Sequence, residues 1–142
     1  MNLDELYTEM IIQYSRETKH RKQMDNATAT KRGVNPSCGD DITLQILIED
    51  EIVKEIAYIG EGCAISHAST EMLAELIEGK TVEEAKELIE TFLGMIKKDI
   101  TEEEKLEKLG SAIVLQNISN MPARVKCAVL AWHTLKEALK NK

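Results

Sequence analysis

The chain of 142 residues has no long apolar run, because its hydrophobic stretches are short and interrupted by charged residues. A helix that spans a bilayer needs about 20 consecutive apolar residues, so we expect no membrane span. The first residues include Asp4, Glu5 and Glu9 and lack the basic flank and apolar segment of a secretory signal peptide. These absences predict a protein that acts in the cytoplasm.

An excess of positive charge is also missing. The chain has 18 Lys and Arg against 25 Asp and Glu, which gives a formal net charge of -7. Binding to nucleic acid requires a basic surface that neutralises phosphates, so we expect no nucleic-acid partner. Two short basic clusters, at 19–22 and 31–32, are interpreted as solvated surface, with docking of a partner protein as the alternative.

Cysteine is scarce, and the three that occur form no close pairs. An odd number without an export signal makes a disulfide framework a poor explanation in a reducing compartment, so we expect thiols or metal ligands. The two close cysteine pairs of a zinc ribbon are absent. A glycine-rich phosphate loop and a serine-based triad are absent as well, which leaves the cysteines as the expected site of chemistry.

The length predicts one domain, residues 1–142, because domains commonly have about 100 to 150 residues. Apolar residues make up 43% and charged residues 30%, which is usual for a folded globular protein. No repeat or linker divides the chain.

The first half predicts one helix followed by short strands. Apolar residues at three- and four-residue spacing indicate an amphipathic helix from residue 3 to about residue 18. Alternating threonines suggest a short strand over 27–32. Apolar and polar residues alternate over 41–49, and 52–59 has a similar composition. These last two segments are expected to form an antiparallel hairpin with a turn at 49–51.

The second half predicts helices. After Cys63 the apolar period changes from two to about 3.6, and Gly79 is placed for a C-terminal cap. Three further helix starts are predicted from capping-box or proline signals: Thr81 with Glu84, Thr101 with Glu104, and Asn120 with Pro122. The sequence therefore predicts an α+β fold in which a small antiparallel sheet of about three strands packs against several helices.

Four residues form the candidate functional site. Cys38 and Asp40 lie in a turn-forming segment, Cys63 at a strand-to-helix junction and Cys127 in the second turn of the last helix. Three thiolates and one carboxylate suit tetrahedral zinc, and thiolates also suit iron-sulfur clusters. The alternative is that each cysteine is a small buried hydrophobe.

The surroundings of two cysteines are expected to favour the thiolate. Cys63 lies where the positive end of a helix dipole is predicted. Cys127 follows Arg124 and Lys126, whose positive charges act in the same direction.

The three histidines are not assigned to the site. His67 follows the second cysteine by four positions, a spacing that can place both on one metal, but four better ligands exist and a helix-surface histidine is favoured. His133 is interpreted as a packing residue and His20 as a surface residue. Ser66 and Ser69 are expected to cap a helix.

Three stretches carry a resemblance to a known family: NPSCGD at 35–40, GEGCAIS at 60–66 and PARVKCAVLAW at 122–132. They resemble the U-type iron-sulfur cluster assembly family, which comprises the SufU and IscU proteins and the N-terminal domain of NifU. The SufU branch is the most similar. Lys126 stands where IscU proteins have a histidine, the segment between the second and third cysteines is longer, and the LPPVK motif is absent.

The resemblance implies a zinc ion bound by Cys38, Asp40, Cys63 and Cys127. It also implies a sulfurtransferase that receives persulfide sulfur from a PLP-dependent, SufS-like cysteine desulfurase and passes it to downstream iron-sulfur assembly proteins. Cys38 is the implied acceptor, freed when a desulfurase side chain displaces a thiolate from zinc. Arg124 and Lys126 are implied as charge partners or docking residues.

Two other functions remain open from the same residues. The first is a scaffold that assembles and transfers a 2Fe-2S cluster on the same ligands. The second is a structural zinc domain that serves only as an interaction module.

Overall fold

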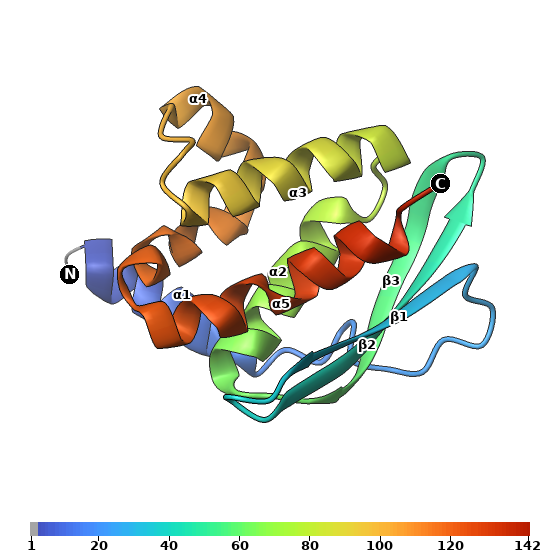
Figure 1. Cartoon of the computed structure of the whole chain (residues 1–142), viewed down its shortest axis with the longest axis horizontal. Helices are drawn as coiled ribbons and strands as arrows, with labels where there is room; N and C mark the ends of the chain where they lie inside the picture. Colours follow the sequence, from blue (N-terminus) through green and yellow to red (C-terminus); the bar gives the residue numbers. More distant parts are fainter. Residues whose placement is uncertain (1–2) are drawn as a thin grey trace.

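Three antiparallel strands form a sheet whose one face is covered by helices, in a computed structural model that describes residues 3–142 (Figure 1). The elements in chain order are α1 (Leu3–Ser15), β1 (Ala29–Asn35), β2 (Asp40–Glu49), β3 (Ile52–Glu61), α2 (Ala64–Ile77), α3 (Val82–Ile96), α4 (Glu103–Leu106), the 3-10 helix η1 (Glu107–Asn120) and α5 (Pro122–Ala138). The predicted α+β class is confirmed, while residues 1–2 of the predicted domain lie outside the described part. Within that part, no helix has the length and apolarity needed to cross a membrane.

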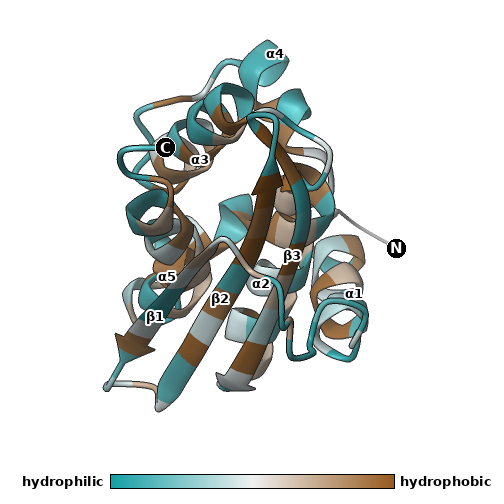
Figure 2. Cartoon of the chain, turned by 90° about the vertical axis from the view of Figure 1, so that its right-hand side faces the viewer, coloured by the Kyte–Doolittle hydropathy of each residue, from teal (hydrophilic) through white to brown (hydrophobic). Residues whose placement is uncertain are grey.

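The sheet has the strand order β1-β2-β3, and Figure 2 views it from the face that the helices leave open. The turn between β2 and β3 is made by Asp50 and Glu51, whose φ angles of 54° and 63° suit a two-residue type I′ turn. The predicted hairpin is therefore confirmed. The strand predicted over 27–32 lies further along the chain, because β1 stays paired with β2 down to Asn35 and Asp40.

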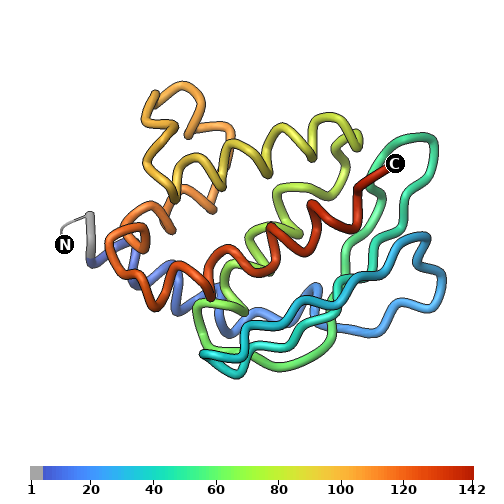
Figure 3. Tube along the Cα trace, in the orientation of Figure 1, coloured from blue at the N-terminus to red at the C-terminus, as the bar shows by residue number. Residues whose placement is uncertain are grey.

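One end of the molecule collects three segments that are far apart in the sequence (Figure 3). They are the turn between β1 and β2, the start of α2 and the start of α5. Hydrogen bonds join them, from the Cys63 amide to Asp40 and from the Cys127 thiol to Cys38. The topology therefore brings the candidate site residues to one place.

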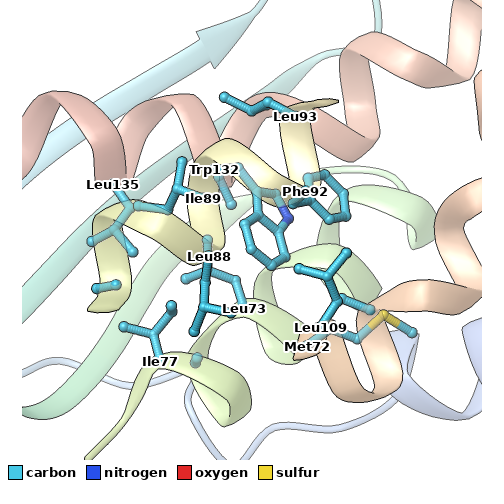
Figure 4. Close-up of a cluster of buried hydrophobic side chains, with 14 of the residues drawn as sticks. Met72, Leu73, Ile77, Leu88, Ile89, Phe92, Leu93, Leu109, Trp132 and Leu135 are labelled. Carbon is cyan, nitrogen blue, oxygen red and sulfur yellow. The ribbon is translucent and has the colours of Figure 1, made fainter. Parts of the chain in front are cut away.

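The hydrophobic core lies between the sheet and helices α2, α3 and α5 (Figure 4). The rings of Phe92 and Trp132 stack with centroids 3.8 Å apart and an interplanar angle of 2°. The indole N–H of Trp132 donates to Ser69 Oγ at 2.8 Å, and the Ser69 hydroxyl donates to the carbonyl of Ala128 at 2.6 Å. Ser69 therefore joins α2 to α5 and does not cap a helix, contrary to the prediction.

Two predicted helix starts are found where expected. The amide of Glu84 donates to Thr81 Oγ1, and the amide of Thr81 donates to Glu84 Oε1, each at 3.1 Å. This is the predicted capping box of α3. Pro122 lies in the first turn of α5, as predicted, but Asn120 is not its N-cap.

The third predicted helix start is displaced by one residue, because α4 has Glu102 and not Thr101 as its N-cap, and the predicted capping box does not form. The amides of Asp99 and Ile100 both donate to the carbonyl of Gly94, at 2.9 and 3.1 Å, so backbone bonds fix the turn that leaves α3. Helical bonding resumes only at Glu102, the N-cap of α4, which has no side-chain cap. The chain then continues as the 3-10 helix η1, which is broken at Gly110 with φ 56°.

The segment between α1 and β1 is fastened by His20, which is only 4% exposed, so its assignment to the surface is wrong. Its Nδ1 lies 2.8 Å from Glu71 Oε1, and its Nε2 lies 2.9 Å from Glu78 Oε1. Ionised carboxylates only accept hydrogen bonds, so donation from both ring nitrogens requires the imidazolium form. The hydrogen bond with Glu71 raises the pKa of His20 against the opposing effect of burial, and Glu78 raises it further.

The basic clusters lie on the surface, as predicted, and pair with acidic side chains. Lys22 Nζ is 3.0 Å from Glu55 Oε1. Arg32 donates to both oxygens of Asp41, at 2.9 and 2.7 Å. His133, interpreted from the sequence as a packing residue, is exposed on α5.

Replacing His20 by glutamine is expected to lower the free energy of unfolding by about 3 kcal/mol at about pH 6, because it leaves two carboxylates without their cation. The pKa of His20 is raised in the folded protein, so its contribution is complete below the ordinary histidine value of about 6.5 and is lost as the pH rises through the folded value. When wild type and His20→Gln are unfolded with urea, their free energies of unfolding should differ less at about pH 9 than at about pH 6.

The matched control is Lys22→Gln, which removes an exposed ion pair. It is expected to cost less than about 1 kcal/mol at both pH values. A difference between His20→Gln and wild type that does not change with pH would contradict the imidazolium form.

Candidate metal centre

Cys38 lies on the turn that joins β1 to β2. Strand pairing ends at Asn35 and Asp40, which leaves Pro36 to Gly39 as the connection. The amide of Cys38 donates to the carbonyl of Asn35 at 3.2 Å, and Gly39 has a φ of 70°, a conformation that glycine adopts without strain. Cys38 is exposed, so another protein can reach its thiol.

Asp40 and Cys63 are joined by a hydrogen bond. Asp40 is the first residue of β2 and is fully buried, and its Oδ1 accepts from the Cys63 amide at 2.8 Å. Cys63 is the N-cap of α2, and its Sγ accepts from the Ser66 amide at 3.4 Å. The predicted location of Cys63 at the positive end of a helix dipole is confirmed. Ser66 does not cap α2, contrary to the prediction: Cys63 is the cap, the Ser66 amide is the donor that it accepts, and the Ser66 hydroxyl has no hydrogen-bond partner in the described part of the chain.

Cys127 lies in the second turn of α5 and is 4% exposed. Its Sγ is 3.0 Å from Cys38 Sγ. Burial raises the pKa of the Cys127 thiol, and hydrogen bonds with Cys38 and Cys63 act in the same direction. Burial therefore outweighs any effect of the exposed cations Arg124 and Lys126, contrary to the expectation that they favour the thiolate.

Three of the four candidate ligands lie close enough together to bind one metal ion, and the fourth lies beside them. One ligand atom each from Cys38, Asp40 and Cys127 lies within 4.8 Å of the other two, an arrangement that can hold a metal ion. In a tetrahedral site with Zn–S bonds of about 2.3 Å, neighbouring sulfurs are about 3.8 Å apart. The sulfurs of Cys38 and Cys127, which are 3.0 Å apart, would therefore separate when they bind one ion. Cys63 is outside this group of three, but its thiol is near enough to raise the pKa of Cys127, so it borders the same centre.

A groove of about 770 Å³ opens beside the three cysteines. Its walls come from α1, the end of η1 and the starts of α2 and α5. The apolar lining residues are Tyr7, Ile11, Ile12, Ile65, Val114, Ile118 and Met121. Arg124 also lines the groove, with Nη1 3.6 Å from Met121 Sδ, whereas Lys126 is not a lining residue. Of the two cations considered from the sequence, only Arg124 faces the groove.

Two polar residues near the site are buried, of which one was predicted to lie on the surface and the other was not considered as a site residue. His67 is buried, with Nδ1 3.1 Å from the Tyr58 hydroxyl, so the assignment to the helix surface is wrong; burial lowers its pKa. Asn35 is buried as well, and its Nδ2 faces Asp40 Oδ2 at 3.4 Å. In the sequence, Asn35 before Pro36 signals only a turn.

Residues 6–141 match the family described as NifU-like N terminal domain. The chain belongs to this family. The resemblance seen in the three sequence stretches is confirmed, and the NifU-like protein can be assigned to an iron-sulfur cluster assembly family.

Curated relatives and solved structures cover nearly the whole NifU-like chain. It is 44% identical over 136 residues to the iron-sulfur cluster assembly scaffold protein IscU of Thermotoga maritima, covering 96% of this chain and 94% of the relative. It is 33% identical over 138 residues to the zinc-dependent sulfurtransferase SufU of Bacillus subtilis, covering 97% and 92%. A crystal structure of a candidate scaffold protein for the SUF system from Fervidobacterium islandicum matches with a TM-score of 0.89 and 37% identity, covering 98% of this chain and 100% of that one. The names of these relatives thus divide between scaffold and sulfurtransferase.

Replacing Gly62 by alanine is expected to disturb the link between Asp40 and Cys63. A Cβ at this position would lie 2.9 Å from Asp40 Oδ1 and 3.0 Å from Ser66 Oγ, so the carboxylate must move. We expect the affinity for Zn²⁺, measured by competition with a chromophoric chelator, to fall by about tenfold or more.

The control is Gly79→Ala. Gly79 has a φ of 89° and no atom within 4 Å of an added Cβ, so the substitution strains the backbone away from the cysteines. It should lower the free energy of unfolding by about 1 kcal/mol or more and leave the zinc affinity unchanged. Equal zinc affinities of Gly62→Ala and wild type would contradict the role assigned to this contact.

Proposed function

We propose that this protein is a zinc-dependent sulfurtransferase of iron-sulfur cluster biogenesis, which accepts persulfide sulfur from a PLP-dependent cysteine desulfurase on Cys38. The observation that carries the proposal is an exposed thiol on a turn, 3.0 Å from the buried thiol of Cys127. The relative named zinc-dependent sulfurtransferase, at 33% identity, supports it. Downstream iron-sulfur assembly proteins then receive the sulfur.

The donor set fits zinc. Ligand atoms of Cys38, Asp40 and Cys127 lie within 4.8 Å of one another, and Cys63 offers a third sulfur beside them. Thiolate sulfur and carboxylate oxygen are both ordinary zinc ligands in tetrahedral sites. Bound zinc favours thiolates at neutral pH and does not oxidise them, because it has no redox chemistry.

The transfer step is a thiol exchange on a persulfide. The Cys38 thiolate attacks the terminal sulfur of the desulfurase persulfide, so that a new S–S bond forms on Cys38. The bond between the terminal sulfur and the desulfurase cysteine breaks, and that cysteine leaves as a thiolate. No oxidant or reductant is needed, because one persulfide replaces another.

The remaining site residues hold and surround the acceptor. Asp40 ties the turn of Cys38 to the start of α2 through the Cys63 amide. Arg124 and Lys126 are exposed cations on α5, and Arg124 lines the groove beside the thiols. Their charge is suited to an acidic surface on the sulfur donor.

A second function is favoured by the relatives named as scaffolds, one of which is 44% identical to this chain. In this function the same four residues hold a 2Fe-2S cluster as cargo and pass it to an apo-protein. Thiolate ligands suit such a cluster as well as they suit zinc.

Transfer of radiolabelled sulfur from cysteine, catalysed by a SufS-like desulfurase, tests the first function. We expect the wild-type protein to take up the label and to accelerate the desulfurase, and we expect Cys38→Ser to do neither, because a hydroxyl cannot carry the persulfide. Ser37→Ala, in the same turn, should behave as wild type.

Labelling of Cys38→Ser at the wild-type level would contradict the assignment of the acceptor. An unlabelled wild-type protein that forms a coloured 2Fe-2S species on anaerobic reconstitution, and transfers it, would establish the scaffold function instead. Binding to the desulfurase without transfer of sulfur or of a cluster would indicate a structural zinc domain that serves only as an interaction module.

Removal of metal by a chelator should lower the melting temperature of the wild-type protein by at least about 5 °C. The reason is that the ligands come from three segments of the chain, which a bound ion ties together. Cys127→Ser lacks one buried ligand and should show a much smaller shift. An unchanged melting temperature of the wild type, after a metal content near one per chain has been measured, would show that the ion does not stabilise the fold.

A further inference from the structure

Asn35 occupies a fixed place at the base of the turn that carries Cys38. It is the last residue of β1 and pairs with Asp40, the first residue of β2. Its carbonyl accepts the Cys38 amide at 3.2 Å, and Pro36 follows it, which restricts Asn35 to extended backbone. The residue is only 7% exposed, and asparagine is mostly found on the surface. A buried amide needs polar partners inside the protein.

The partners of the Asn35 amide are two of the proposed ligands. Its Nδ2 lies 3.4 Å from Asp40 Oδ2 and 3.9 Å from Cys127 Sγ. An amide nitrogen carries two hydrogens, so one group can donate to both atoms. Asp40 belongs to β2 and Cys127 to α5, and Asn35 therefore bridges ligands from two separate elements.

We infer that Asn35 is a positioning residue of the metal centre, which holds the Asp40 carboxylate and the Cys127 sulfur in ligating positions through its amide. This inference rests on the proposed function, in which both residues bind the metal. Asn35 itself is not a ligand.

The charge of the site explains why an amide is suited to this place. Three thiolates and a carboxylate carry more negative charge than a divalent cation neutralises, so donors around the ligands stabilise the centre. The carboxylate of Asp40 is fully buried and needs a donor for each oxygen. The Cys63 amide donates a hydrogen bond to Oδ1, and the Asn35 side-chain amide donates one to Oδ2. A carboxylate in place of Asn35 would repel Asp40, and an apolar side chain would leave Oδ2 without its donor.

The test uses Co²⁺ as a spectroscopic probe on the full chain. Asn35→Leu keeps a similar volume and removes the donor, whereas Asn35→Ser stays polar and is too short to bridge both partners. We expect both variants to bind Co²⁺ about 10- to 100-fold more weakly than wild type, as is usual when an outer hydrogen bond to a metal ligand is lost. We also expect their thiolate-to-Co²⁺ charge-transfer bands to move to longer wavelength, because a sulfur that loses a hydrogen bond is a better electron donor.

A role in folding alone would not move the charge-transfer bands. Gln45→Leu is the matched control, because it removes another buried side-chain amide. Gln45 lies in the middle of β2, its Oε1 accepts from the Met24 amide, and it does not line the groove. It should keep the wild-type affinity and band positions.

Unchanged Co²⁺ affinity and band positions in Asn35→Ser or in folded Asn35→Leu would overturn the role of Asn35 alone. Absence of thiolate bands from the wild type itself would overturn both this role and the proposed metal site. The two failures are therefore distinguishable in one set of spectra.

Discussion

The hydrogen bond from the Cys63 amide to Asp40 Oδ1, at 2.8 Å, is the contact on which the arrangement of the site depends. A buried carboxylate is costly unless donors surround it, and the first amides of a helix have no partner within the helix. One bond meets both requirements. Because Asp40 begins β2 and Cys63 precedes α2, the turn of Cys38 and the start of α2 are held in fixed relation.

Helix α2 is fastened along its whole length by polar contacts to other elements. Asp40 acts at its start, and Ser69 links it to α5 through the Trp132 indole and the Ala128 carbonyl. Further along, Glu75 accepts from the Tyr14 hydroxyl of α1 at 3.1 Å, and Glu71 faces His20. Helix α2 is thus held by the sheet, by α1 and α5, and by the segment before β1. The first residues of this helix border the thiols.

The sequence was sufficient for features that depend on neighbouring residues. The capping box of Thr81 and Glu84 and the turn of the β2–β3 hairpin involve residues within a few positions, and both were predicted correctly. Thr101 and Glu104 have the same residue types at the same spacing, yet they form no capping box, because α4 begins one residue later, with Glu102 as its N-cap. The same local pattern therefore predicted a nearby helix start in both places, but the cap itself in only one of them.

Features set by distant residues were missed or only suspected. The burial of His20 depends on Glu71 and Glu78, which are 51 and 58 positions away. Cys38 and Cys127 are 89 positions apart, so spacing alone could not show that their sulfurs meet. The family resemblance implied that Cys38 and Cys127 belong to one site. No pattern in the sequence indicated that the amide of Asn35 is buried.

The buried thiol of Cys127 has a consequence for how the centre is filled. Burial raises its pKa and so favours the protonated thiol, which an ion bound as we propose would have to deprotonate. Binding of a metal ion there, as we propose, would thus release a proton from this sulfur. In the proposed metal centre, acidity would compete with the ion for this sulfur, so the occupancy would depend on the pH of the surroundings as well as on the supply of metal.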